Sequence, residues 1–186
     1  MKYKILSESE YKKNKLTLTT IDNSKIQQIR IWRNQQIDIL RQHKFITEEE
    51  QELYFTTKVF PLFEENFPAQ ILFNCYHDDI FIGYGGIVHI SYENKTGEIS
   101  FLLDPLIQDK LFYEKIFITF LDLMTNVAFE ELSLNKLFTE TYSTRIDHVP
   151  LLEKAGYRLE GIRRSHIVLN NQFADIYLHG KFPDLF

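Results

Sequence analysis

The fold of this chain is decided by Thr96–Tyr157, TGEISFLLDPLIQDKLFYEKIFITFLDLMTNVAFEELSLNKLFTETYSTRIDHVPLLEKAGY. Residues 96–104 and 136–142 are apolar and β-prone, so each is predicted to form a strand. Between them, residues 109–132 place apolar side chains at the spacing of a helix with one broad apolar face: Phe112, Ile116, Phe120, Leu123 and Val127. A strand–helix–strand unit of this length predicts a right-handed crossover between two parallel strands.

Four short motifs in and just after this stretch narrow the prediction. They are Glu98-Ile99, Ala128–Leu132 (AFEEL), Leu134–Lys136 (LNK) and Leu152–Gly161 (LEKAGYRLEG). Their order and spacing resemble the GNAT N-acyltransferase superfamily. The likeness is greatest to the branch that holds the ribosomal-protein alanine acetyltransferases and related bacterial amino-sugar acetyltransferases.

The rest of the chain is expected to complete a single α/β domain spanning residues 1–186. The predicted strands number about seven and the helices about four. Besides the central unit, we expect strands at 16–21, 70–76, 80–90, 158–169 and 172–182, a hairpin turn at Asn170-Asn171, and helices at 25–41, 47–62 and 146–155. The resemblance implies a GNAT fold: a mixed sheet, antiparallel in its N-terminal part, whose central parallel pair splays apart at the cofactor cleft.

Composition and charge exclude several classes of protein. The net charge of −5 argues against a nucleic-acid partner, which requires clustered Lys and Arg. Cys75 is the only cysteine, so no disulfide forms within the chain. No stretch has the length of a signal peptide or a membrane span, and we expect a cytoplasmic protein without membrane contact. The six histidines show no metal-ligand spacing, so no metal is expected; a homodimer is a possible assembly.

The resemblance implies acetyl-CoA as co-substrate. The main chain of Phe101, Leu102 and Leu103 would bind the pantetheine arm, and the segment that starts at Gln108 would meet the phosphates. Family members carry two small residues in this phosphate loop, where the present chain has Leu111 and Tyr113. The remaining predicted cofactor contacts are cationic: Lys110 and Arg145.

Two residues are candidates for acid–base catalysis. Glu98 matches the glutamate that serves as general base in the histone acetyltransferase branch. His148 lies near the start of the helix where related enzymes carry a serine, and an imidazole can donate or accept a proton near neutral pH. The alternative interpretations are that Glu98 is a structural carboxylate and that His148 is a surface histidine.

The predicted acceptor is a primary amine on a small molecule, namely an amino-sugar nucleotide used for surface polysaccharide. The run Trp32-Arg33-Asn34 resembles the N-terminal part of the amino-sugar acetyltransferases, and an arginine can bind a diphosphate bidentately. Tyr84 joins this run as a predicted substrate-binding residue. Two alternatives remain open at this point: acetylation of a peptide or ribosomal-protein N-terminus, and a GNAT-like binding domain without catalysis.

Overall fold

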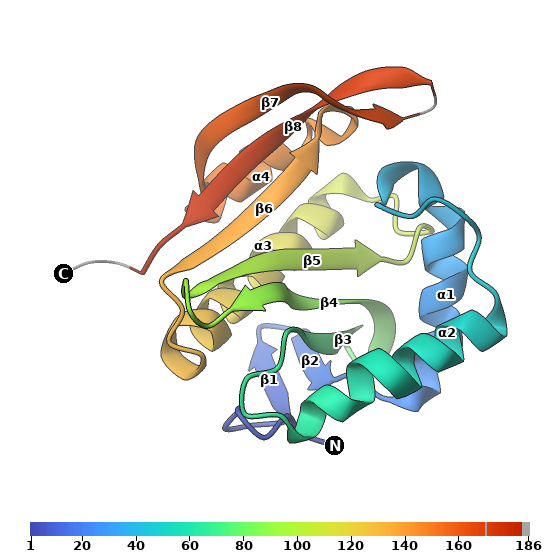
Figure 1. Ribbon diagram of the computed structural model, residues 1–186, viewed down its shortest axis with the longest axis vertical. Coiled ribbons are helices and arrows are strands. Elements are labelled where there is room, and N and C mark those ends of the chain that lie inside the picture. Colours follow the sequence, from blue (N-terminus) through green and yellow to red (C-terminus); the bar gives the residue numbers. More distant parts are fainter. Residues whose placement is uncertain (170, 184–186) are drawn as a thin grey trace.

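The computed structural model describes residues 1–169 and 171–183, and the strands within them form one mixed sheet (Figure 1). The strand order is β1-β2-β3-β4-β5-β6-β8-β7, with only β5 and β6 parallel among the described neighbours. The strands are β1 (Glu10–Lys13), β2 (Leu16–Thr20), β3 (Ile71–His77), β4 (Ile80–Ser91), β5 (Thr96–Leu103), β6 (Lys136–Tyr142), β7 (Arg158–Leu169) and β8 (Gln172–Lys181).

The mixed sheet and its parallel centre are confirmed, with one strand more than predicted. The additional strand is β1, whose sequence EYKK is polar and mostly exposed at the edge of the sheet, so it lacks the alternation that marks a half-buried strand. Asn170 of the predicted hairpin turn lies outside the described residues.

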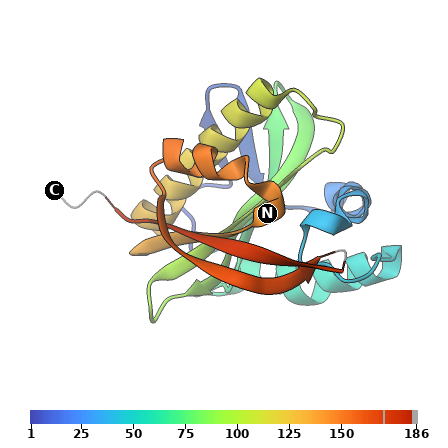
Figure 2. The ribbon, with the colours of Figure 1, turned by 90° about the horizontal axis from the view of Figure 1, so that it is seen from above.

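Four α-helices cover the two faces of the sheet. They are α1 (Ile26–Gln35), α2 (Glu48–Tyr54), α3 (Lys110–Asn126) and α4 (His148–Lys154). Helices α3 and α4 lie on one face, and α1 and α2 lie on the other (Figure 2). Rings of α3 pack on β5, where Phe101 contacts Phe117 and Phe120. Buried side chains lie on both faces of the sheet, because residues of α3 and of the segment 26–64 both belong to the core.

The parallel pair separates soon after it begins. The described register between β5 and β6 comprises Thr96↔Lys136, Gly97↔Leu137 and Glu98↔Phe138. Beyond Glu98 the two strands diverge, with β5 staying paired to β4 and β6 staying paired to β8 (Figure 1). This confirms the predicted splay and opens the sheet at its centre.

A β-bulge interrupts strand β4 beside the splay. Val88 pairs with Glu98 and Ser91 pairs with Thr96, so β4 has one residue more than β5 between these two pairs. His89 lies in this bulge with a φ of 50°, a left-handed conformation that is uncommon for residues other than glycine. Bulges of this kind redirect a side chain and often lie next to active sites.

Candidate active site

Two cavities meet at the bulge. The first, the sheet cleft, has a volume of about 270 Å³ and lies at the divergence of β5 and β6, where Glu98, Phe101, Glu140 and His148 line it. The second, the helix cavity, has a volume of about 920 Å³ and lies between β3–β5 and the helical segment 26–64. The residues that line both cavities form their shared wall: Arg33, Val88, His89 and Ser100.

A chain of ion pairs crosses the sheet cleft. Arg41 Nη2 donates to Glu98 Oε1 at 2.7 Å and to Glu140 Oε2 at 2.9 Å. Arg163 Nη1 donates to Glu140 Oε1, also at 2.9 Å. Burial acts to lower the pKa of Arg41, but the carboxylates of Glu98 and Glu140 outweigh it and raise that pKa above its ordinary value. Glu98 is thus inside the cleft as predicted, although both of its oxygens contact a guanidinium.

His148 lies at the other end of the sheet cleft and is held by its neighbours. Arg145 Nη2 lies 2.9 Å from His148 Nε2, and the hydroxyl of Tyr113 lies 3.2 Å from the same nitrogen. Burial, and then the charge of Arg145, lower the pKa of His148 to about 3. The ring is therefore neutral at pH 7, and its Nε2 lone pair accepts from Arg145.

The N-terminus of α3 carries its own carboxylate. Asp109 Oδ1 accepts from the backbone N–H of Leu111 at 2.9 Å and of Phe112 at 3.1 Å. These first-turn amides are the groups that a helix N-terminus offers to a phosphate. Gln108 and Lys110 are exposed beside them, and the Lys110 ammonium lies 3.5 Å from Asp147. Exposed side chains, rather than a glycine loop, therefore face the predicted phosphate position.

Among the described residues, the splay leaves one edge of β5 without a strand partner beyond Glu98. The main chain of Phe101, Leu102 and Leu103 lies beyond the last parallel pair of β5, so this edge faces the cleft rather than β6. The carbonyl of Leu103 already has a hydrogen-bond partner, because Gln36 Nε2 donates to it at 2.9 Å. The side chains of Leu102 and Leu103 are buried, which leaves the backbone as the part of this segment that can contact a ligand.

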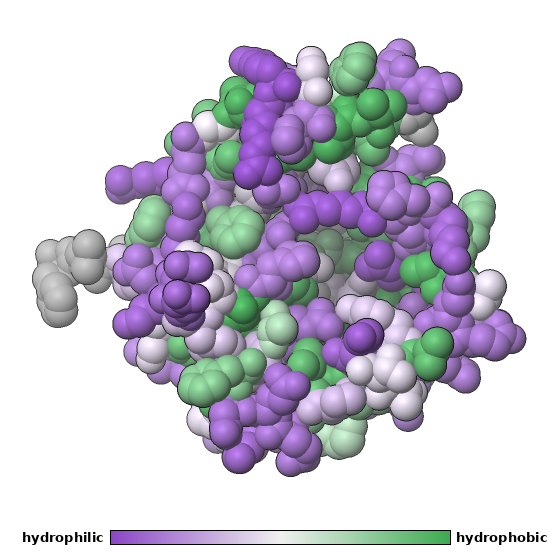
Figure 3. Space-filling model, in the orientation of Figure 1, coloured by the Kyte–Doolittle hydropathy of each residue, from purple (hydrophilic) through white to green (hydrophobic). Residues whose placement is uncertain are grey.

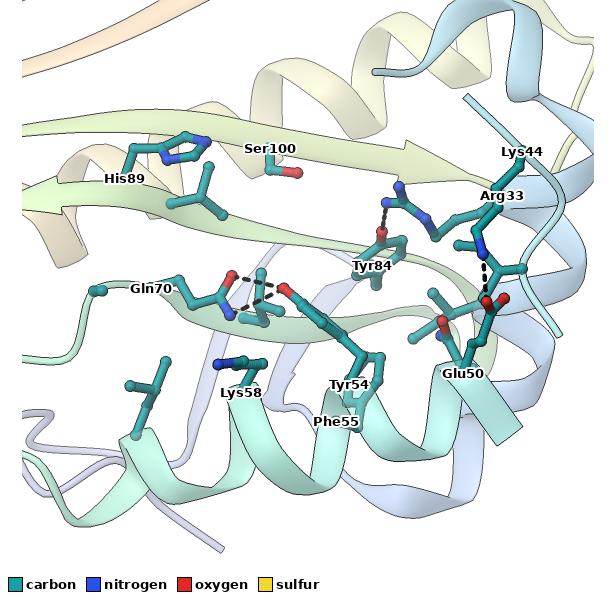
Figure 4. Close-up of a pocket in the computed structure, with 17 residues that line it drawn as sticks. Arg33, Lys44, Glu50, Tyr54, Phe55, Lys58, Gln70, Tyr84, His89 and Ser100 are labelled. Atoms are coloured by element: carbon teal, nitrogen blue, oxygen red, sulfur yellow. Dashed lines mark hydrogen bonds and ion pairs between the residues drawn. The ribbon is translucent and has the colours of Figure 1, made fainter. Parts of the chain in front are cut away.

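The helix cavity is basic and contains aromatic rings (Figure 4). Arg33 Nη1 donates to the Tyr84 hydroxyl at 2.6 Å, and Lys44 Nζ pairs with Glu50 at 2.5 Å. Tyr54 and Lys58 extend from the helical segment toward the strands. Around the opening, the face seen in Figure 3 is hollowed near its centre and bordered mainly by hydrophilic residues.

Two residues of the Trp32-Arg33-Asn34 run support the fold instead of facing a cavity. Trp32 is 4% exposed and stacks on Phe81, with 4.9 Å between ring centroids. The Asn34 side chain donates to the carbonyl of Ile46 and accepts from its N–H, both at 2.9 Å. Arg33 alone of the three lines the cavities described above, and Tyr84 joins it there.

Sequence reasoning missed His89, Arg41 and Glu140. Each is an ordinary polar residue in its segment, and only tertiary pairing brings it to the cleft. For Glu140 a signal existed: Glu98 and Phe138 are register partners, and Glu140 follows two residues later on the same side of β6. For Arg41 and His89 the sequence offers no comparable signal.

An open mixed sheet with a splayed central parallel pair and helices on both faces defines the class of acyltransferases with a GNAT fold. Residues 18–178 match the family model described as an acetyltransferase (GNAT) domain, and the chain belongs to that family. The superfamily prediction and the prediction of an acyltransferase are thereby confirmed. The predicted co-substrate, acetyl-CoA, accords with this membership.

Solved structures share the fold. A spermidine N-acetyltransferase from Vibrio cholerae in complex with CoA and spermine is 19% identical with a TM-score of 0.78, over 90% of this chain and 95% of that chain. A dodecameric structure of spermidine N-acetyltransferase from Vibrio cholerae in an intermediate state is 20% identical with a TM-score of 0.73, over 90% and 94%.

Two searches of the described residues bear on metals and membranes. In residues 1–169 and 171–183, no group of three or more His, Cys, Asp or Glu side chains is arranged to hold a metal ion. Within the same ranges, no helix has the length and apolar character needed to cross a membrane.

Proposed function

We propose that this protein is a cytoplasmic enzyme that transfers an acetyl group from acetyl-CoA to a primary amine on a small molecule. The observation that carries the proposal is the shared wall, at which the sheet cleft and the larger helix cavity meet. Acetyl-CoA supplies an acetyl group activated as a thioester. The chain's own groups hold it: the main chain of residues 101–103 along the arm, with Gln108, Lys110 and Arg145 toward the phosphates.

The acceptor that the helix cavity favours carries negative charge. Besides His89, its lining includes three cations, Arg33, Lys44 and Lys58, and one carboxylate, Glu50. This local excess of positive charge opposes the overall −5 of the chain. Polyamines, the substrates named for the Vibrio cholerae structures, are cations and would be repelled here. A diphosphate would instead pair with Arg33 and Lys58.

An amino-sugar nucleotide satisfies these requirements. The exposed ring of Tyr54 offers a face on which a sugar or base can stack. The amine would reach the shared wall, where the carboxylate of Glu98 is nearby in the sheet cleft. We therefore propose an amino-sugar nucleotide for surface polysaccharide as acceptor. Pairing of two copies of the chain stays a prediction.

An acceptor screen tests this function. The purified protein is given acetyl-CoA with UDP-glucosamine, glucosamine, spermidine or a peptide with a free N-terminal alanine, and release of the CoA thiol is followed. We expect the highest kcat/KM with UDP-glucosamine. Turnover only of the peptide would support the N-terminal acetyltransferase alternative. No turnover of any acceptor would support the alternative of a GNAT-like binding domain without catalysis.

A variant that removes one positive charge from the helix cavity tests whether the acceptor is anionic. Lys58→Gln should raise KM for UDP-glucosamine about 10- to 150-fold while leaving kcat nearly unchanged, because a charge-assisted hydrogen bond is worth roughly 1.5–3 kcal/mol. Lys115→Gln, which removes an exposed lysine of α3 outside the helix cavity, is the matched control. Equal KM values in the two variants would contradict an anionic acceptor in this cavity.

A further inference from the structure

The imidazole of His89 occupies an unusual place in the molecule. The bulge of β4 presents it at the wall shared by the sheet cleft and the helix cavity, and Figure 4 shows it among the residues of the helix cavity. Its side chain is 70% exposed, so a ligand in either cavity can reach the ring. A left-handed backbone at a non-glycine residue is kept only where the surrounding structure enforces it, and such outliers cluster at functional sites.

The two bases expected from the sequence are both engaged. Each oxygen of Glu98 is contacted by the Arg41 guanidinium, at 2.7 and 3.4 Å. His148 Nε2 accepts from Arg145 and lies against the Tyr113 hydroxyl. The Nε2 lone pair of His148 is therefore occupied. Glu98 is held by the guanidinium of Arg41, while each of its oxygens keeps a lone pair that can accept from a further N–H.

His89 differs in its surroundings. The contact described for its ring is with Glu98, whose Oε2 lies 3.8 Å from His89 Nε2. This separation is longer than a hydrogen bond, so the pair needs a rotation of the exposed ring to form one. The charged and titratable groups that share the two cavities with His89 are Arg33, Arg41, Lys44, Glu50, Tyr54, Lys58, Tyr84, Glu98, Glu140, Tyr142, Arg145 and His148. Of these, Glu98 is the carboxylate placed to face Nε2–H.

From this geometry, and resting on the proposed function, we infer that His89 is the catalytic residue that takes the proton from the acceptor amine. Glu98 acts as a positioning residue that accepts from Nε2–H and leaves the Nδ1 lone pair free for the amine. The C–N bond forms at the acetyl carbonyl carbon as the C–S bond of the thioester breaks. The amine proton passes to Nδ1, and the electron pair of the C–S bond leaves with the CoA sulfur.

The left-handed backbone supplies a decisive pair of variants. Asn and Gly tolerate a φ of 50° better than most residues, so His89→Asn and His89→Gly should fold normally. We expect both to keep the wild-type affinity for acetyl-CoA by calorimetry, and His89→Gly to have an equal or higher Tm. We expect kcat with the best amine of the acceptor screen to fall about 10²–10⁴-fold, the range for loss of a general base.

Three further measurements separate catalysis from structure. In the wild type kcat should rise with pH along a limb that His89→Asn lacks, because the Asn side chain cannot take up the amine proton. Added imidazole should restore part of the activity of His89→Gly and none of Glu98→Gln. His166→Asn, which replaces an exposed histidine of β7, is the control and should match the wild type.

The outcomes are distinguishable from a failure of the proposed function. If the wild type turns over an amine and kcat is unchanged in His89→Asn, the role of His89 is wrong and the proposed function stands. A larger loss in Glu98→Gln or His148→Ala than in His89→Asn would also overturn the role of His89 and identify the base. Absence of wild-type turnover with every amine tested would overturn the proposed function, and this inference with it.

Discussion

Asp109 sets the character of the donor site at the scale of single residues. Its carboxylate caps the first-turn amides of α3 and adds a negative charge where phosphates are expected. Asp109→Ser keeps a capping side chain and removes the charge. We expect the affinity for CoA to increase about two- to fivefold, since a charge at a helix terminus is worth roughly 0.3–1 kcal/mol. Isothermal titration calorimetry measures it, and unchanged or weaker binding would contradict the prediction.

Asp109→Ala separates the two roles of the residue. This variant removes the charge and the cap together, so it should also lower the Tm, because loss of an N-cap costs about 0.5–2 kcal/mol. A Tm equal to that of Asp109→Ser would show that the cap contributes nothing to stability.

The buried His148 makes the stability of the fold depend on pH. Its pKa is lowered to about 3, whereas an unfolded chain has a histidine pKa near 6.5. Between these values the unfolded state binds the extra proton, so His148 is destabilising as pH falls from about 6.5 toward 3 and has no effect above. The contribution to the slope is up to about 1.4 kcal/mol per pH unit.

Urea unfolding at a series of pH values tests this dependence. The free energy of unfolding of the wild type should fall more steeply below pH 6.5 than that of His148→Gln, which has no titrating ring. Parallel curves for the two proteins would show that His148 is charged in the folded state.

At the scale of secondary-structure elements, the pairing of β6 with β8 contains a defect. The hydroxyl of Thr139 and both ring nitrogens of its register partner His179 are buried without a hydrogen-bond partner in the described part of the chain. A buried polar group without a partner costs about 1–3 kcal/mol. Thr139→Val keeps the shape, suits a strand and should raise the Tm by about 2–4 °C for each kcal/mol gained.

Thr119→Val is the matched control for this element. Thr119 is also buried, but its hydroxyl donates to the Lys115 carbonyl at 2.8 Å, so removing it should not stabilise the protein. Differential scanning calorimetry compares the two variants. An equal shift in both would show that helix or strand propensity, and not the unpartnered hydroxyl, is responsible.

The elements differ in how far the sequence predicts them. Local chemistry predicts the capping box of α2, in which Thr47 and Glu50 bond each other's backbone N–H, and it is present. The predicted helix at 25–41 instead ends at Gln35, with a short 3-10 turn at 37–39. Residues 39–41 line the sheet cleft, where Arg41 pairs with Glu98 and Glu140. Those partners are far away in sequence, so no local signal reports them.

The residues of the candidate site also differ in how far the sequence predicts their position. Glu98 and Phe101 belong to a strand whose position follows from the βαβ unit, and both line the sheet cleft. The sequence around Trp32 does not distinguish a core ring from a ligand-binding ring. In the structure Trp32 stacks on Phe81, so it belongs to the core. His89 depends on a bulge in the pairing of β4 with β5, and a register shift is not encoded in either strand alone.

For the whole molecule, donor binding should appear as global stabilisation. A ligand that binds only the folded state at about 100 times its Kd adds roughly 2.7 kcal/mol. For a chain of 186 residues this corresponds to an increase in Tm of about 5–10 °C. Thermal unfolding with millimolar acetyl-CoA, with pantetheine as control, measures it. No shift with acetyl-CoA would favour the alternative of a binding domain without catalysis.

The wall shared by the two cavities has a consequence for the order of events in turnover. We expect the donor to bind in the sheet cleft and the acceptor in the helix cavity. Because these meet at Arg33, Val88, His89 and Ser100, both substrates can be bound together and the acetyl group can pass directly between them. Cys75, the one cysteine of the chain, is buried, and burial raises the pKa of its thiol, so it is a poor carrier of a covalent acetyl group. Steady-state kinetics should therefore be sequential, with double-reciprocal lines that intersect; parallel lines would reveal an acetylated enzyme.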